Sequence, residues 1–207
     1  MVQNTKPQRG RPRAYDPEIA LTRAMDKFWS TGYAATSLDD LSDAMRMNRP
    51  SIYAAFGDKE ALYRLAFDHY RSRARAAIGK ALAGKRPLRR ALRDFYERAI
   101  EIYLSGETPA RGCFMIGTTL TEAVANPELR GMVAESLQGL DRVLAARIAL
   151  GQQRGEVHKE ANPAELGQIG SAMLYLLAIQ ARAGGTRKSL KATMNAALNT
   201  ICAPIST

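Results

Sequence analysis

The stretch Thr36–Leu62, TSLDDLSDAMRMNRPSIYAAFGDKEAL, has the pattern of two short helices joined by a tight turn and followed by the start of a third. Ser37 and Asn48 belong to the residue types that cap helix N-termini, and Gly57 belongs to the type that ends helices. The turn is short, Arg46-Met47-Asn48. Two helices joined in this way form a helix-turn-helix, whose second helix fits the major groove of DNA.

Residues in and around this motif match a known pattern: Phe28, Gly32-Tyr33, Thr36-Ser37-Leu38, Leu41, Ala44 and, above all, Ser51–Leu62 (SIYAAFGDKEAL). Through them, residues 10–65 resemble the DNA-binding module of tetracycline-repressor-like (TetR family) transcriptional regulators. The rest of the chain matches that family in length and helical character only. The resemblance implies a ligand-responsive regulator, expected to be a repressor, that binds a palindromic operator as a homodimer and is released by a small molecule.

The turn departs from the family pattern at Arg46, where most members have glycine. This position favours positive φ, which a residue with a Cβ adopts at a cost of roughly 1 kcal/mol. Two interpretations stay open. Either the turn differs slightly here, or Arg46 accepts the strain and its side chain is free to reach a phosphate.

The second helix of the motif, Arg49–Phe56, is predicted to read the DNA. Arg49 is the first candidate for a base contact, because a guanidinium matches the O6 and N7 atoms of guanine. Ser37 could instead be only a cap, Tyr53 only a core residue and Lys59 only a solvated lysine. The further candidates for contact with bases, phosphates or backbone, some implied by the resemblance, are Tyr33, Thr36, Ser37, Ser51, Tyr53, Ala54, Ala55 and Lys59.

A basic arm precedes the motif and contains Arg9-Gly10-Arg11-Pro12-Arg13. This core is similar to an AT-hook, in which arginines enter a narrow A·T-rich minor groove. We therefore expect Arg9, Arg11 and Arg13 to bind DNA, with a plain unstructured tail as the alternative.

Apolar residues keep helical spacing along the whole chain and no segment alternates like a strand, which predicts an all-α fold of about nine helices. We expect a flexible basic arm (1–15), a three-helix helix-turn-helix domain (16–62) and a helical bundle for ligand binding and dimerisation (63–207). The helices predicted after the motif span residues 58–82, 87–104, 113–125, 126–151, 163–182 and 186–201.

The resemblance places a small-molecule pocket inside the bundle, although plain core is the favoured alternative for each candidate. Glu122 could pair with a cationic ligand or face solvent. Cys113 follows Arg111-Gly112, a basic setting that could lower its thiol pKa and make it a redox or electrophile sensor. The predicted lining residues are Phe67, Phe95, Tyr96, Tyr103, Cys113, Phe114, Met115, Thr118, Glu122 and Tyr175.

The last two predicted helices are candidates for a four-helix dimer interface, because they combine small residues with larger apolar ones. The alternative is a monomer whose core contains the same residues. The predicted interface residues are Gly170, Met173, Leu174, Leu177, Ala178, Ala181, Met194 and Leu198.

The net charge of +10 and the pI near 9.9 favour a polyanionic partner. Residues 64–93 alone carry ten bases against one acid, Asp68. They form either a second binding surface or a solvated face. A sequence-tolerant architectural DNA-binding protein is the alternative function.

The remaining sequence features argue against an enzyme, a metal site, a secreted protein and a membrane protein. His69 and His158 are isolated, and no catalytic, phosphate-binding or metal motif is present, so we expect neither an enzyme nor a cofactor nor a metal site. Two unpaired cysteines favour a reducing compartment. The first residues do not resemble a signal peptide, and the longest apolar run, 172–179, is too short to span a bilayer. We expect a soluble cytoplasmic protein.

Overall fold

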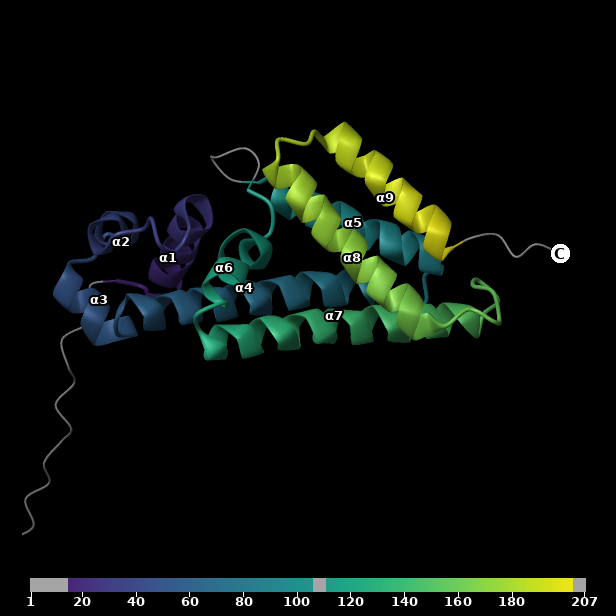
Figure 1. The fold of residues 1–207 in the computed structure, drawn as a ribbon, viewed down its shortest axis with the longest axis horizontal. Coiled ribbons are helices and arrows are strands. Elements are labelled where there is room, and N and C mark those ends of the chain that lie inside the picture. The colour runs from purple at the N-terminus through teal and green to yellow at the C-terminus, as the bar shows by residue number, and fades with distance from the viewer. Residues whose placement is uncertain (1–14, 106–110, 203–207) are drawn as a thin grey trace, which may run out of the picture.

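A computed structural model describes residues 15–105 and 111–202, and all regular structure within them is helical (Figure 1). The predicted all-α fold is confirmed. The elements are α1 (Pro17–Thr31), α2 (Leu38–Met45), α3 (Arg49–Phe56), α4 (Lys59–Leu82), α5 (Leu88–Tyr103), η1 (Met115–Thr119), α6 (Leu120–Glu122), α7 (Pro127–Gln152), α8 (Pro163–Arg182) and α9 (Arg187–Ile201).

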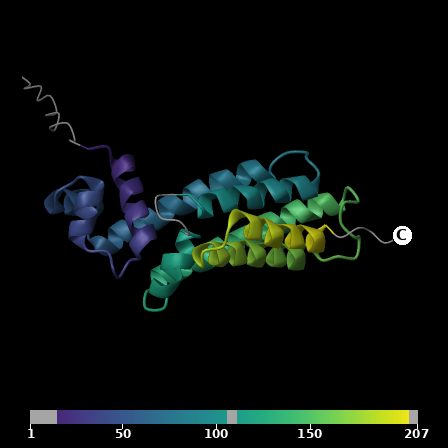
Figure 2. The same cartoon turned by 90° about the horizontal axis from the view of Figure 1, so that it is seen from above.

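The molecule is elongated, with α1–α3 at one end and the bundle of α5 and α7–α9 at the other (Figures 1 and 2). Helix α4 runs unbroken from the three-helix module into the bundle, where it lies beside α7. The boundary predicted between residues 62 and 63 therefore falls inside α4, so this helix belongs to both parts. A movement of α4 in the bundle must reach the helices at the other end.

The helix starts follow the chemistry predicted from the sequence. The carboxylate of Asp16 accepts hydrogen bonds from the backbone of the first turn of α1, and Asn126 and Asn162 do the same for α7 and α8. In each case proline follows, where its missing N–H costs nothing. Ser37 and Asp40 form a reciprocal capping box on α2.

Aromatic side chains join the two parts of the molecule. Phe114 is fully buried and stacks near the rings of Tyr63, Phe67 and Tyr70, with centroids 5.5–6.2 Å apart. Trp29 of α1 meets Phe114 edge-on at 6.0 Å. Its indole N–H donates to the Arg111 carbonyl at 3.2 Å. Trp29 is core, as expected, and it contacts the bundle directly.

The segment predicted as one helix over 113–125 is divided in the structure. Residues Met115–Thr119 form a π-helical stretch, and Leu120–Glu122 form only a short α-turn. The Thr118 hydroxyl donates to the Phe114 carbonyl at 2.8 Å and accepts from the Tyr63 hydroxyl at 2.8 Å. These side-chain bonds fix the segment against α4, where periodicity alone predicted an ordinary helix.

Candidate nucleic-acid interface and bundle cavity

The turn of the helix-turn-helix accepts backbone strain at Arg46. Its φ and ψ of 54° and 45° are left-handed, and it is the single non-glycine residue with positive φ in 15–105 and 111–202. The strained interpretation of this turn is therefore confirmed. Arg46 is exposed, so its side chain is free to reach a phosphate, and that role stays a prediction.

Arg49 opens α3 and is tied to α2 by an ion pair. Its Nε donates to Asp39 Oδ1 at 2.8 Å, and its Nη2 lies 2.5 Å from the same oxygen. The hydrogen bond that Arg49 donates to Asp39 raises the pKa of Arg49. With one edge of the guanidinium held, its far end remains available for a guanine. The role of Asp39 could not be predicted from the sequence, because it lies ten residues before Arg49 and on a different helix.

The outer face of α3 is exposed and carries mostly small side chains, which suits a helix that enters a groove. Ile52 is fully buried, whereas Tyr53 is 49% exposed and Ala54 and Ala55 are exposed. Ser51 is half-buried. Tyr53 is thus not a core residue, and the four outward residues keep their predicted contacts with DNA as predictions.

Tyr33 and Lys59 lie together beside this face. The Lys59 ammonium is 4.4 Å from the centroid of the Tyr33 ring, which itself packs at 4.9 Å from the ring of Tyr63. Burial raises the pKa of the Tyr33 hydroxyl, which stays a neutral hydrogen-bond donor. The pair brings a positive charge to the start of α4, a suitable place for a phosphate.

The prediction for Thr36 is wrong. Its side chain is 1% exposed, and its hydroxyl donates to the Gly32 carbonyl at 2.5 Å and contacts the Thr31 hydroxyl at 2.7 Å. Ser37 is exposed, but its hydroxyl donates to Asp40 at 2.6 Å. This hydrogen bond, with Lys27, holds the pKa of Asp40 well below its usual range. Ser37 therefore serves as a helix cap, and its contact with DNA stays a prediction.

The basic arm is not described by the structure: Arg9, Arg11 and Arg13 lie outside the described residues.

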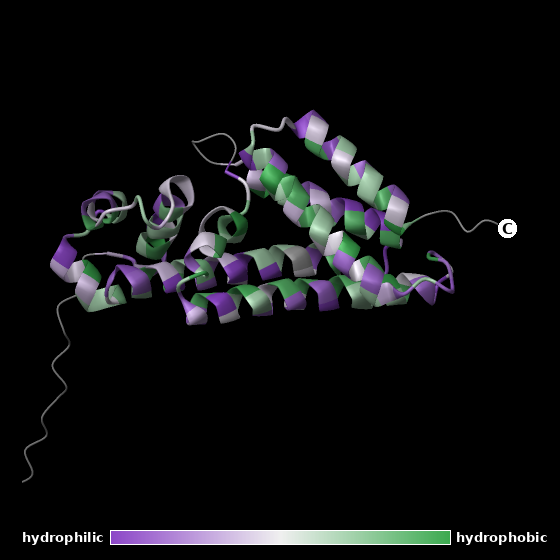
Figure 3. Cartoon of the chain, in the orientation of Figure 1, coloured by the Kyte–Doolittle hydropathy of each residue, from purple (hydrophilic) through white to green (hydrophobic). Residues whose placement is uncertain are grey.

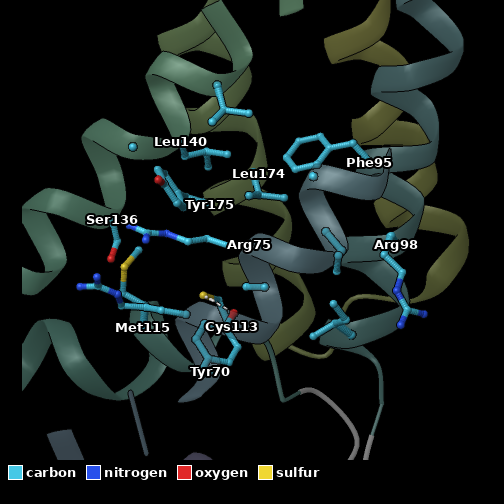
Figure 4. A pocket seen from close by; sticks show the side chains of 18 of the residues that line it. Tyr70, Arg75, Phe95, Arg98, Cys113, Met115, Ser136, Leu140, Leu174 and Tyr175 are labelled. Atoms are coloured by element: carbon cyan, nitrogen blue, oxygen red, sulfur yellow. Dashed lines mark hydrogen bonds between the residues drawn. The ribbon is translucent and has the colours of Figure 1, made fainter. Parts of the chain in front are cut away.

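A cavity of about 620 Å³ opens within the bundle between α4, α5, α7 and α8 (Figure 4). Its size falls in the range of small-molecule sites. Apolar and aromatic side chains form most of its wall. Six predicted lining residues do line it: Phe67, Phe95, Tyr103, Cys113, Met115 and Tyr175.

Four other predicted lining residues lie outside this wall. The Tyr96 hydroxyl donates to the Gly170 carbonyl at 3.0 Å, in the core behind the cavity. Phe114 and Thr118 belong to the buried junction with the module. Glu122 lies on α6, beyond the cavity. The predictions for these four are wrong because residues on one helix face at helical spacing can serve different layers of a bundle.

Sequence reasoning missed the charged part of the wall, Arg71, Arg75, Arg98 and Arg142. Arg71 donates to Glu135 at 2.8 Å and to the Met132 carbonyl at 3.1 Å, which commits it to α7. Glu122 was the only predicted charge, and it was of the opposite sign. The run of bases in 64–93 was the available signal, because two of the four arginines belong to it.

Cys113 is buried against the cavity with its Sγ 3.0 Å from the Tyr70 hydroxyl (Figure 4). Burial raises the pKa of this thiol. Activation by Arg111, the less favoured of the two interpretations, has no support in the geometry, because the Arg111 guanidinium lies 4.0 Å from the Trp29 ring centroid and pairs with Asp26 instead. Cys113 thus acts here as a small buried side chain.

The predicted dimer residues lie mostly on the wrong face of their helices. All except Met173 are buried within the single chain: Gly170, Leu174, Leu177, Ala178, Ala181, Met194 and Leu198. In the single chain they pack α8 and α9 onto the bundle. The outward stripe of α8 is also apolar, with Ile169 at 40%, Leu176 at 40% and Ile179 at 53% exposure, and Figure 3 shows α8 as largely hydrophobic.

Two further features bear on function. In the part of the chain that the structure describes, no cluster of His, Cys, Asp or Glu has the arrangement of a metal site. Over those same residues, no helix combines the length and apolar character needed to cross a membrane.

Comparisons with known proteins agree with this geometry. Residues 20–66 match the family "Bacterial regulatory proteins, tetR family", and residues 87–202 match "Tetracyclin repressor-like, C-terminal domain". The HTH-type transcriptional repressor ComR of Escherichia coli is 32% identical over 190 residues, covering 91% of this chain and 90% of ComR. BdcR of the same organism, another HTH-type transcriptional repressor, is 31% identical over 52% of this chain and 54% of its own length.

Solved structures extend the similarity. A cysteine mutant of the TetR family regulator CifR, complexed with 26-base-pair operator DNA, superposes with a TM-score of 0.78 at 33% identity. The match covers 91% of this chain and 98% of that one. A TetR family regulator from Agrobacterium tumefaciens, at 20% identity, shares the fold with a TM-score of 0.80 over 90% of this chain and 97% of its own.

Proposed function

The chain belongs to the TetR family of transcriptional regulators, which are DNA-binding proteins and not enzymes, and we propose that it is a repressor that binds a palindromic operator as a homodimer and is released by a small molecule. The observation that carries this proposal is the 620 Å³ cavity, whose wall touches the buried contact between bundle and DNA-binding module.

The physical link from cavity to DNA runs through few side chains. Tyr70 and Cys113 line the cavity, and Tyr70 packs edge-on against Trp29 of α1 with centroids 5.1 Å apart. A ligand that displaces Tyr70 or tilts α4 also shifts α1 and, through it, α3. Such a ligand acts as an inducer only if it binds the DNA-free arrangement more tightly than the DNA-bound one.

On DNA, α3 enters the major groove. Arg49 contacts a guanine while Asp39 holds its other edge, and Tyr53, Lys59 and Arg46 contact phosphates around it. In a dimer with two-fold symmetry the two α3 helices would reach successive major grooves, about 34–36 Å apart. The operator is therefore palindromic in this proposal.

The dimer forms through the exposed stripe of α8, together with the outer face of α9. Ile169, Leu176 and Ile179 recur at helical spacing, so two copies related by a two-fold axis can pack them against each other. We expect Leu176→Glu to give a monomer in sedimentation at micromolar concentration, and Val124→Glu, an exposed apolar residue outside α8, to leave a dimer. A parent chain that sediments as a monomer would refute this part of the proposal.

The central test is a fluorescence-anisotropy titration of DNA near physiological salt. It compares duplex from the upstream region of the protein's own gene with scrambled duplex of equal length. A preference of about 10³ or more supports a specific regulator. Equal binding that persists across a selection from genomic DNA would favour the architectural alternative. Duplex found in this way then serves to screen small molecules for release.

Arg49→Ala tests the base-reading helix. We expect the variant to lose about 1–3 kcal/mol of operator binding and to relax the preference at one base pair. Arg93→Ala removes the same charge from an exposed position on α5 and is the control. Unchanged operator affinity in Arg49→Ala would show that Arg49 reads no base.

A further inference from the structure

We propose that the bundle cavity takes an organic anion with an elongated apolar body, whose anionic group lies against Arg75 and whose second acceptor atom lies at the Tyr103 hydroxyl. This inference names the ligand class of the cavity and so rests on the proposed function above. Nothing in the comparisons assigns a ligand to this chain.

The sign of the cavity's charge is the first observation. Among the described residues, its wall contains four arginines and no Asp, Glu, Lys or His. Two of the four already have partners: Arg71 pairs with Glu135 and the Met132 carbonyl, and Arg98 pairs with Glu101 at 2.9 Å in an exposed contact. The charged side chains that line the cavity are positive and their carboxylate partners lie outside the wall, so an anion gains more from this wall than a cation does.

Arg75 is the arginine best placed to meet the ligand. Figure 4 shows its side chain extending across the cavity between Tyr175 and Leu140 on one side and Tyr70 and Cys113 on the other. Its one ion pair is loose, with Nη2 at 3.6 Å from Glu135, and both side chains are more than half exposed. Exposed pairs of this kind contribute little, so a ligand anion can replace or share the contact.

Tyr103 supplies the second contact. Its side chain is 4% exposed and lines the cavity, and within the described residues its hydroxyl has no hydrogen-bond partner. Burial raises its pKa well above the ordinary value, so it remains an O–H donor at physiological pH. Because Tyr103 lines the cavity, its hydroxyl can donate to an acceptor atom of a ligand at that point.

The wall also sets the length of the ligand. On α4 it runs from Phe67 to Gly79, twelve residue steps or about 18 Å along the helix axis. Tyr103 and Cys113 share the end near Tyr70, and Arg75 lies further along α4. The apolar body between them contacts Phe95, Leu140 and Leu174. An anion of this shape would therefore place its uncharged end beside the junction with the DNA-binding module.

Two fluorescent dyes of nearly equal shape provide the test. 8-Anilinonaphthalene-1-sulfonate has an apolar body and a sulfonate, and N-phenyl-1-naphthylamine is the same body without the charge. We expect the full-length protein to bind both, and Arg75→Ala to weaken the sulfonate dye about tenfold while changing the neutral dye less than twofold. Arg93→Ala, outside the cavity, should leave both affinities unchanged.

Tyr103→Phe removes one oxygen at the end of the cavity where the two dyes are identical, so it is expected to change both dye affinities alike and to leave the circular dichroism spectrum unchanged. Equal losses for both dyes in Arg75→Ala, no loss for either, or no binding of the sulfonate dye by the parent would each overturn the inference. The assay contains no DNA. A chain that binds the sulfonate dye through Arg75 but stays on its operator with every anion tested would refute the proposed release and leave this inference standing.

Discussion

The DNA-binding module and the bundle cavity are built in opposite ways. The module uses neighbours in sequence: α1–α3 occupy residues 17–56, and each turn, cap and inward residue is set within a few positions. The cavity collects its wall from α4, α5, α7, α8 and the segment that contains Cys113 and Met115. The comparison teaches that local chemistry specifies the recognition surface, whereas tertiary packing alone specifies what the ligand meets.

Phe114 packs between the module and the bundle, so Phe114→Ala should have the largest effect on stability. The ring is fully buried among aromatic side chains of both parts. Removing it should lower the free energy of unfolding by about 3–5 kcal/mol. Urea denaturation measures this loss. A single transition shared by both regions is expected, and a loss below about 1 kcal/mol would mean that module and bundle are joined elsewhere.

Gly112 tests how tightly the cavity segment is packed against α8. Its φ is +65°, and a Cβ there would lie 2.7 Å from the Ala178 carbonyl oxygen. Gly155 has φ +72° and open space around it, so it is a matched control. Gly155→Ala should cost about 1 kcal/mol from backbone strain alone, and Gly112→Ala about 2–3 kcal/mol. Equal losses of unfolding free energy for the two variants, in thermal or urea unfolding, would show that the segment moves away from α8 without further cost.

The sequence predicted the fold and most of the module correctly because these depend on local rules. Caps at Asp16, Asn48 and Asn126 and the turn at Arg46 can be read from residue type and spacing. Thr36 was mispredicted because its short side chain folds back onto the end of α1. A hydroxyl beside a cap looks the same in sequence whether it faces DNA or the protein.

The cavity and the dimer face could be predicted only in part. The residues Phe67, Phe95 and Tyr103 were recognised as apolar and inward, but so were Tyr96 and Phe114, which lie in another layer. On α8, apolar residues cover both the inner stripe and the outer one, so periodicity could not separate core from interface. Which layer a helix face meets depends on the crossing of helices, and no local rule encodes it.

Asp39 sharpens the comparison inside the module, because spacing did not predict its pair with Arg49. The pair is exposed, so it should contribute little to stability. We expect Asp39→Ala to weaken specific operator binding several-fold and to strengthen binding to scrambled duplex, because a negative charge near DNA is lost. Asp43→Ala, on the same helix and exposed, should change both affinities alike. Identical behaviour of the two variants in anisotropy titrations would mean that Asp39 does not position Arg49.

Substitution of Arg46 should have the smallest effect of the four, and it separates the contribution of this residue to stability from its contribution to DNA binding. Its left-handed backbone is strained for a residue with a Cβ, so Arg46→Gly should raise the free energy of unfolding by about 0.5–1 kcal/mol. If the side chain also reaches a phosphate, the same variant should bind the operator more weakly, with a salt slope smaller by about 1. Arg46→Asn, with a residue that tolerates the left-handed region, separates the two effects because it relieves part of the strain while removing the charge. A more stable Arg46→Gly variant with an unchanged salt slope would show that Arg46 destabilises the fold and contacts no phosphate.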